Sequence, residues 1–293
     1  MHIALLGTGL MGEPLARRLL EEGHAVTVWN RSPGKTDALA AEGAGVAAYP
    51  HEAMGAADWV ITMVANADAI HEVLLNPQSR AALAGRRVLN MATIAPHEAR
   101  QLRDDVAAAG GEFMECTVLG SIPEAKSGSL ILMFGGTPGQ FEAAGPLLAA
   151  FGGNPLFIGE VGKAATLKLA MNQLIAGLTA SFALSLGLVQ REGLEVDRFM
   201  EVLRDSALYA PTFDKKLGRM AESQYADPNF PLEHLLKDVH LMEDAARKDG
   251  LDTSLMATIG GLLEQAEAQG LGKSDYAALF EAVAPQRGDP QSN

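Results

Sequence analysis

The chain of 293 residues has little cysteine and little positive charge. Its single cysteine, Cys116, excludes an intrachain disulfide framework and fits a reducing, cytoplasmic compartment. The formal net charge of −13 lacks the basic footprint that nucleic acids and anionic membranes require, so neither is an expected partner. A small anionic substrate stays open, because a local pocket of lysine or arginine can lie on an acidic surface.

Long apolar runs and metal-ligand spacings are also missing. The longest apolar stretch, residues 174–189, is interrupted by Gly, Thr and Ser and falls short of a membrane span. None of the seven histidines stands in a Cys/His cluster or an H-x-x-x-H spacing, so no metal site is expected. No secretory or transit segment is expected before the first strand, which begins almost at Met1.

Residues 1–162 alternate short apolar runs with stretches of helical periodicity, and this alternation predicts a mostly parallel sheet covered on both faces. The helical period is clearest in 14–22, 35–42 and 96–109. Strands are expected at 3–6, 26–29, 59–63, 87–90, 112–115, 130–134 and 155–158.

No convincing strand follows residue 162, so residues 163–285 are expected to form a second, all-helical domain. Its first helix, about 164–192, is apolar nearly all round and is expected to be buried. The polar tail 286–293, rich in proline and glycine, is expected to be frayed.

A glycine motif follows the first strand: residues 7–12 read Gly-Thr-Gly-Leu-Met-Gly, between a strand and a helix. In this context Gly7 permits a tight turn, Gly9 lets the backbone approach a pyrophosphate, and Gly12 lets helix and strand pack closely. The helix N-terminus then offers N–H groups to the phosphates. The first domain is therefore expected to be of the Rossmann type and to bind a dinucleotide.

The end of the second strand indicates which dinucleotide is bound. Readers of NAD usually place a carboxylate there, on the ribose 2′-hydroxyl. This chain has Asn30, Arg31 and Ser32, with Lys35 close behind. The Arg31 guanidinium suits a 2′-phosphate, so NADPH is expected rather than NADH, although Arg31 could also be an ordinary solvated residue.

Lys168 and Asn172 stand four residues apart on the apolar helix, and hence on one of its faces. A lysine in these surroundings must find a partner, reach solvent or lower its pKa. Such a lysine can protonate a carbonyl oxygen as hydride reaches the carbon, with Asn172 binding the same oxygen or orienting the ammonium. An interdomain salt bridge is the alternative.

Two further segments are candidates for binding a substrate. Lys237, beside Asp238, could bind a carboxylate, and Phe230 could wall an apolar pocket, although Lys237 and Asp238 could equally be solvated helix residues. The backbone N–H groups of Leu119, Gly120 and Ser121 and the Ser121 hydroxyl could hold a carboxylate, or this segment could be only a loop.

Along its first 284 residues the sequence resembles the β-hydroxyacid dehydrogenases, and within them the NADPH-dependent glyoxylate/succinic semialdehyde reductases. The matching segments recur in order at 7–12, 26–31, 91–93, 118–121, 162–172, 230–238 and 270–276. The resemblance implies that Lys168 is the catalytic proton donor and Asn172 its companion. It also implies a homodimer or homotetramer built through the helical domain.

The resemblance also assigns binding roles to residues of both domains. The substrate-binding set it implies is Thr93, Gly120, Ser121, Phe230, Lys237 and Asp238. The cofactor-binding set is Gly7, Gly9, Leu10, Met11, Gly12, Asn30, Arg31, Ser32, Lys35, Val64, Thr93 and Lys237.

Two departures from the family pattern concern substrate recognition. Where the family usually reads Asp-Ala-Pro-Val-Ser-Gly, this chain has residues 115–120 as Glu-Cys-Thr-Val-Leu-Gly, so that Leu119 replaces a serine hydroxyl with bulk. Where the family reads Asp-x-Ser-Thr, this chain has Asn90 and Ala92 before Thr93, which removes a carboxylate and a hydroxyl. Such losses can change substrate discrimination by orders of magnitude, and a bulkier or less acidic carbonyl is compatible with them.

The sequence thus predicts a cytoplasmic oxidoreductase in which NADPH reduces a small aldehyde or keto acid. One alternative is a 3-hydroxyisobutyrate-type dehydrogenase, against which Asn30 and Arg31 speak because that branch more often uses NAD. A non-catalytic dinucleotide-binding partner protein is the alternative of another class. Leu119 and Ala92 motivate it, and the retained Lys168 and Asn172 count against it.

Overall fold

A computed structural model describes residues 1–285, and the predicted frayed tail lies outside the described residues. The chain divides into two compact units, Met1–Lys168 and Leu169–Asn293. The division therefore falls inside the long helix α9 (Lys163–Arg191), a few residues after the boundary that the sequence suggested.

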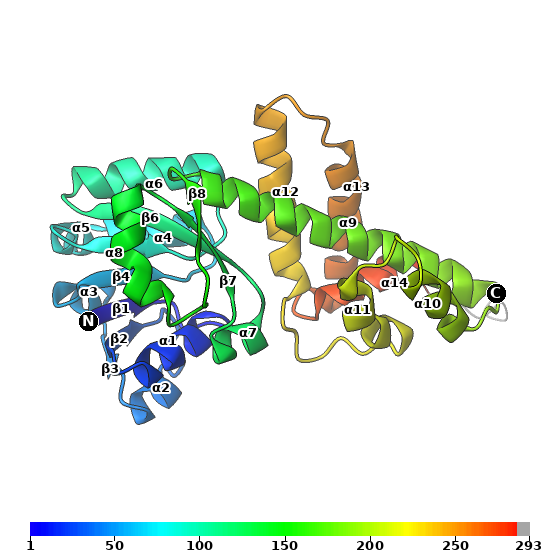
Figure 1. The fold of residues 1–293 in the computed structure, drawn as a ribbon, viewed down its shortest axis with the longest axis horizontal. Helices are drawn as coiled ribbons and strands as arrows, with labels where there is room; N and C mark the ends of the chain where they lie inside the picture. The colour runs from blue at the N-terminus through cyan, green and yellow to red at the C-terminus, as the bar shows by residue number, and fades with distance from the viewer. Residues whose placement is uncertain (286–293) are drawn as a thin grey trace. The chain divides into compact units, whose positions relative to one another are not determined.

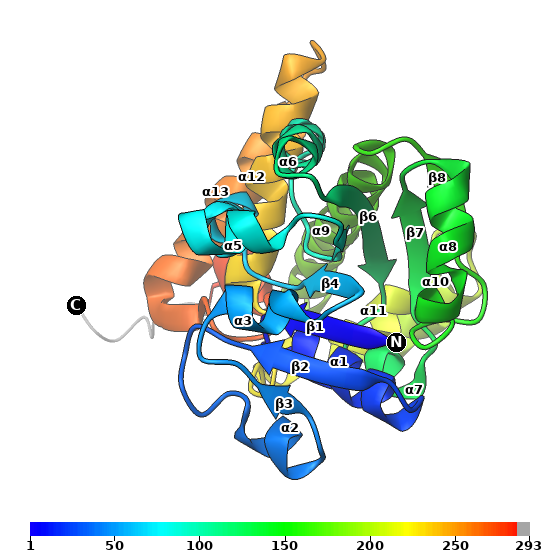
Figure 2. The same cartoon turned by 90° about the vertical axis from the view of Figure 1, so that its left-hand side faces the viewer.

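The first unit is built on an eight-stranded sheet with the order β3-β2-β1-β4-β5-β6-β7-β8, which can be followed in Figure 2 from β3 at the lower edge to β8 at the right. All neighbouring strands are parallel except β6 and β7, as the prediction of a mostly parallel sheet requires. The strands are β1 (His2–Leu6), β2 (Ala25–Trp29), β3 (Gly45–Val46), β4 (Trp59–Thr62), β5 (Arg87–Asn90), β6 (Glu112–Leu119), β7 (Ile131–Gly135) and β8 (Leu156–Gly159).

All seven predicted strands are present, within a residue or so at most ends. Two details differ from the prediction. The two-residue strand β3 was not predicted, because so short a segment carries no periodicity. Strand β6 continues past Glu115 to Leu119, because the polar side chains of Glu115 and Thr117 are buried within it rather than marking its end.

Side chains alternate along the strands and build a separate hydrophobic core on each face of the sheet. In β1, Ile3 and Leu5 face one core, and Ala4 and Leu6 face the other. Helices α1 and α7 pack on the first face and α6 on the second, on opposite sides of the sheet in Figure 1. The helices of this unit are α1 (Gly12–Glu21), α2 (Asp37–Ala41), α3 (Pro50–Gly55), α4 (Ala67–Leu75), α5 (Pro77–Ala82), α6 (Pro96–Ala108), α7 (Ile122–Ser127) and α8 (Pro138–Leu148).

The described part of the second unit contains helices and one isolated β-bridge, between Pro231 and Asp275, so the all-helical prediction is confirmed. Helices α12 and α13 pack against each other along their length (Figure 1). After α9 the elements are α10 (Val196–Arg204), α11 (Pro211–Ala221), α12 (Leu232–Lys248), α13 (Ser254–Ala266), η1 (Glu267–Leu271), η2 (Tyr276–Ala278) and α14 (Leu279–Val283).

Helix α9 is only partly buried, contrary to the prediction. By length and composition it could cross a membrane, but one side of it, including Ala176, Phe182 and Leu186, packs into the core of the second unit. Its other side exposes a row of leucines with side chains 36–64% accessible: Leu174, Leu178, Leu184 and Leu188. The apolar composition of every side of α9 therefore does not mean that every side is buried within one chain.

A buried ion pair fixes the last loop of the second unit. The Lys216 ammonium lies 2.7 and 2.9 Å from the two carboxylate oxygens of Asp275, which is fully buried. The carboxylate also accepts the Ala277 N–H, and the ammonium lies 3.9 Å from the centre of the Tyr276 ring. The pair thereby joins α11 to the turn that precedes α14.

Candidate functional site

The glycine loop has the geometry that a dinucleotide requires. Gly7 has φ +104°, and a Cβ there would lie 2.3 Å from the Met63 carbonyl oxygen at the end of β4. A Cβ on Gly12 would lie 1.8 Å from the Gly7 carbonyl oxygen, so the loop can close onto the start of α1 only with glycine there. A Cβ on Gly9 would meet nothing within 4 Å, which leaves that side open to a pyrophosphate.

Side-chain hydrogen bonds join this loop to the segment after β2. The Thr8 N–H donates to Asn30 Oδ1 at 3.1 Å, and the Thr8 hydroxyl donates to the Lys35 carbonyl at 3.0 Å. Asn30 Nδ2 donates to the Ser32 carbonyl, so both ends of its amide act within the protein. The exposed side chains of Arg31, Ser32 and Lys35 are thus held beside the phosphate loop, and no carboxylate lies between residues 30 and 35.

The remaining predicted cofactor residues lie around this loop. Leu10 is exposed, and Met11 stands at the N-cap of α1. Val64, just after β4, is adjacent to Gly7, because a Cβ on that glycine would lie 2.9 Å from Val64 Cγ1. Thr93 follows β5, whose carboxyl end lies at the same edge of the sheet because β1, β4 and β5 are parallel.

Asn90 has a structural role. It is fully buried, and its Oδ1 accepts the Thr62 hydroxyl at 2.9 Å and the Ala92 N–H at 3.1 Å. Its Nδ2 donates to the Ala92 carbonyl. The amide therefore pins the turn after β5 to β4, and buried Ala92 belongs to the core. The asparagine supplies a donor that a carboxylate in the family pattern would lack.

The Ser121 part of the predicted carboxylate-binding segment already bonds within the protein. The Ser121 N–H and hydroxyl both donate to Glu124 Oε2, at 2.8 and 2.9 Å, as the capping box of α7. Gly120 has φ +122° and packs closely on Leu130. An internal carboxylate thus occupies both Ser121 donors, which the sequence assigned to the carboxylate of a substrate.

Lys168 and Asn172 lie on the continuous helix α9, four residues apart as predicted. Lys168 is half-buried, and Asn172 is 2% exposed. Asn172 Nδ2 donates to Asp238 Oδ2 at 2.5 Å, while its Oδ1 is buried without a hydrogen-bond partner. A buried acceptor without a donor lowers the stability of the fold. Such unsatisfied acceptors are typical of binding sites, where a ligand or another group supplies the donor.

Asp238 and Lys237 lie together on α12. Lys237 Nζ is 3.0 Å from Asp238 Oδ1, and Asp238 is 3% exposed, so neither is the ordinary solvated residue of the alternative interpretation. Phe230 lies just before this helix and makes an edge contact with Tyr276, with ring centres 5.7 Å apart. The second unit thus joins Asn172, Asp238 and Lys237 in one chain of contacts.

Three residues that bond to or pack against the candidates had no predicted role: Thr8, Glu124 and His234. His234 lies one turn before Asp238 and near Phe230, and although its side chain is half-exposed, the partial burial of the ring lowers its pKa. Its spacing from Asp238 was the signal available. The S-x-x-E spacing of Ser121 and Glu124 was likewise visible.

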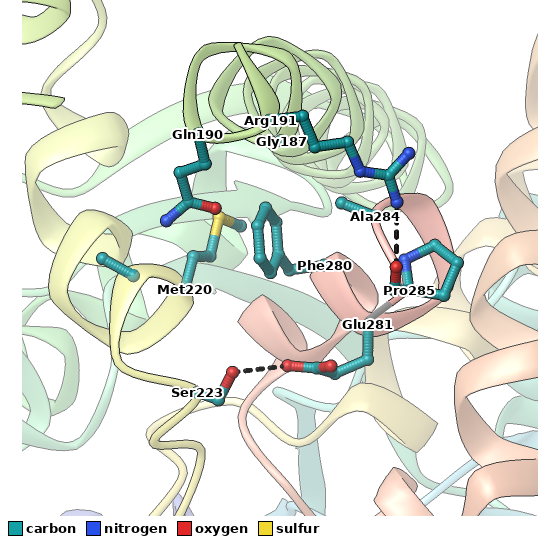
Figure 3. A pocket seen from close by; sticks show the side chains of 10 residues that line it. Gly187, Gln190, Arg191, Met220, Ser223, Phe280, Glu281, Ala284 and Pro285 are labelled. Carbon is teal, nitrogen blue, oxygen red and sulfur yellow. Dashed lines mark hydrogen bonds between the residues drawn. The ribbon is translucent and has the colours of Figure 1, made fainter. Parts of the chain in front are cut away.

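A separate cavity of about 280 Å³ lies about four helical turns along α9 from Asn172 (Figure 3). Glu281 and Ser223 bond across one side of it, and Arg191 donates to the Pro285 carbonyl on the other. None of the predicted site residues lines it. Within residues 1–285, no group of three or more His, Cys, Asp or Glu side chains could hold a metal ion.

Comparisons with known proteins agree with this arrangement. A family model described as the NAD binding domain of 6-phosphogluconate dehydrogenase matches residues 2–159. A second, described as the NAD-binding region of NADP-dependent 3-hydroxyisobutyrate dehydrogenase, matches residues 162–283. The two models meet at the start of α9.

Individual relatives cover nearly the whole chain. The chain is 31% identical to Arabidopsis thaliana glyoxylate/succinic semialdehyde reductase 2, chloroplastic, over 97% of its own length and 79% of the relative's. It is 30% identical to reductase 1 of the same plant, over 97% and 98%. The crystal structure of Salmonella typhimurium 3-hydroxyisobutyrate dehydrogenase matches with a TM-score of 0.85 and 26% identity, over 96% of this chain and 99% of that one. The chain therefore belongs to the β-hydroxyacid dehydrogenase family of NAD(P)-dependent oxidoreductases, with a Rossmann-type first domain and a helical second domain.

Proposed function

We propose that this protein reduces a small aldehyde or keto acid with NADPH, in the manner of a glyoxylate or succinic semialdehyde reductase. The observation that carries the proposal is the state of Asn172. Its Nδ2 is held by Asp238 and its buried Oδ1 lacks a hydrogen-bond partner, one helical turn from Lys168. A fixed acceptor beside a lysine suits a group that must orient an ammonium.

The protein's own residues supply the proton and the orientation. Bound NADPH would supply a hydride to the carbonyl carbon of the substrate. The Lys168 ammonium donates its proton to the carbonyl oxygen, which leaves an alcohol and a neutral lysine that regains a proton from solvent. Asn172 Oδ1 orients the ammonium, and Asp238 keeps the Asn172 amide in one orientation.

The names of the Arabidopsis relatives support a reductase of this type, and the Salmonella structure supports the 3-hydroxyisobutyrate alternative. The test is the loss of NADPH absorbance with glyoxylate, with succinic semialdehyde and with an uncharged aldehyde. Turnover supports the proposal. Binding of NADPH without turnover of any carbonyl would instead favour the dinucleotide-binding partner protein.

Cofactor choice is expected to depend on Arg31. Replacing Arg31 with Asp should lower kcat/KM for NADPH by about 10- to 100-fold, because one charge-assisted contact to the 2′-phosphate is worth about 1.5–3 kcal/mol. NADH turnover should change little or rise. Steady-state kinetics with both cofactors check this, with the exposed Arg80 of α5, replaced by Asp, as the control. A wild type that prefers NADH would contradict the proposal of NADPH.

Acceptance of carboxylate substrates is expected to be limited by Glu124. The variant Glu124→Gln keeps an acceptor for the Ser121 N–H and hydroxyl but removes a negative charge from the predicted carboxylate-binding site. We expect KM for glyoxylate to fall about fivefold, since a unit charge at about 4 Å is worth about 1 kcal/mol even in water. KM for an uncharged aldehyde should stay the same. An equal change for both substrates would place the acid end elsewhere.

We also propose that the chain forms a homodimer or homotetramer through the exposed leucine row of α9. Leu174, Leu178, Leu184 and Leu188 lie along one side of that helix. Several exposed leucines along one side of a helix are typical of an interaction surface.

A further inference from the structure

We propose that Glu115 is a positioning residue that fixes the place of Lys168 by anchoring the first turn of α9 to strand β6. The inference rests on the proposed function, because it assigns a purpose to the position of the proposed proton donor. It is carried by contacts that all lie within the first unit, to which Lys168 also belongs.

The first contact joins the Glu115 carboxylate to the start of α9. Glu115 is fully buried, and its Oε1 accepts the N–H groups of Gly162, Ala164 and Ala165 at 2.7, 3.1 and 3.2 Å. The first N–H groups of a helix have no partner within the helix, and its N-terminus attracts negative charge. One oxygen therefore satisfies three of these groups.

The second contact comes from the same face of the same strand. The Thr117 hydroxyl, two residues after Glu115, donates to the Ala164 carbonyl at 3.1 Å. Side chains two residues apart on a strand point the same way. The strand therefore holds Ala164 by both its N–H and its carbonyl, and this fixes the first turn in translation and in rotation.

The anchored residue is aligned with the proposed catalytic pair. Ala164, Lys168 and Asn172 follow one another at intervals of four and so lie on one face of α9. Lys168 lies only about 6 Å along the helix axis from the anchor. Any shift or rotation of the first turn therefore also moves the Lys168 ammonium. Since proton transfer needs hydrogen-bond contact, a misplacement of about 1 Å can cost 10²-fold in rate.

The surroundings of Glu115 are shaped for a side chain of this length. Gly135 lies opposite it on β7, and a Cβ there would come within 2.5 Å of Glu115 Oε1. Burial raises the pKa of Glu115, while the three N–H groups and the charge of Arg100 act in the opposite direction. The family pattern usually has the shorter aspartate here, and in this protein the longer glutamate side chain reaches the three N–H groups at the start of α9.

The test compares Glu115→Ala and Thr117→Val, each removing one contact, with Glu112→Ala as the control at the exposed start of the same strand. In Glu115→Ala we expect kcat to fall about 10- to 100-fold with KM for NADPH within about twofold. Amide hydrogen exchange at 162–166 should rise, and Lys168 should react at a changed rate with an amine-acylating reagent. Thr117→Val should lower kcat by less, and Glu112→Ala should change none of these.

The proposal is overturned if Glu115→Ala frees the 162–166 amides while kcat and the Lys168 acylation rate stay at wild-type values. It is also overturned if kcat falls only in step with NADPH affinity. Should Glu115→Ala fail to fold, Thr117→Val, which removes the hydroxyl bond to the Ala164 carbonyl, provides the same readouts. If the wild type turns over no carbonyl, the proposed function fails. The exchange and acylation rates then still decide whether Glu115 places Lys168.

Discussion

Replacing Lys168 with alanine is expected to lower kcat for carbonyl reduction by about 10²- to 10⁴-fold, the usual contribution of a positioned general acid. The affinity for NADPH should stay close to that of the wild type, because the open side of the phosphate loop lies at Gly9 and the 2′-phosphate contact is proposed for Arg31. Single-turnover kinetics with saturating NADPH measure the chemical step directly. Ready turnover in the variant would remove Lys168 from this role.

Two further variants separate proton donation from simple charge. Lys168→Arg keeps the positive charge but carries it on a guanidinium, which does not release its proton in proteins. We therefore expect this variant to remain as slow as the alanine variant. Recovery of the rate in Lys168→Arg would show that the charge alone matters. The exposed Lys163, one turn earlier on α9, serves as the matched control, and Lys163→Ala should keep the wild-type rate.

Replacing Lys216 with methionine is expected to lower the free energy of unfolding of the second unit by about 3–5 kcal/mol. The variant leaves the fully buried Asp275 carboxylate without its ammonium partner, and only the Arg219 guanidinium remains as a counter-charge, at 3.9 Å. The melting temperature should fall by about 10 °C. Thermal and urea unfolding followed by far-UV circular dichroism measure both quantities.

A second substitution tests whether the loss comes from a buried carboxylate that has lost its ammonium partner. In the double variant Lys216→Met/Asp275→Leu no buried charge remains, and we expect part of the stability to return. The exposed pair of Lys248 and Asp244 is the control, since breaking it should cost less than about 1 kcal/mol. A double variant as unstable as both single losses combined would show that the pair does not act as a unit.

The sequence predicted the elements whose pattern is local. Strand β5 is found at the predicted residues 87–90, and the positions of Gly7 and Gly12 followed from the motif between strand and helix. The continuation of β6 was missed because Glu115 and Thr117 are polar and yet buried. Their partners, Gly162 to Ala165, lie almost 50 residues further along the chain.

The limits at the site have the same physical origin. The role of Asn90 depends on Thr62, which lies on another strand, so no local pattern shows it. The Asp238 partner of Asn172 lies 66 residues away. By contrast, Glu124 stands three residues after Ser121, and the capping-box spacing could have been recognised. The exposed leucines of α9 show that apolar composition alone cannot distinguish the buried side of a helix from its exposed side.

The reaction rate of the single thiol can report how often the first unit opens. Cys116 is fully buried in β6, directly after Glu115, and burial raises the pKa of its thiol. Electrophilic reagents that thiolates attack can therefore reach it only when the central sheet of the first unit separates. Because the chain has no second cysteine, the labelling rate measures the rate of that separation at a single site. A bound cofactor that stabilises the first unit should slow it, so ligands can be ranked without any assay of turnover.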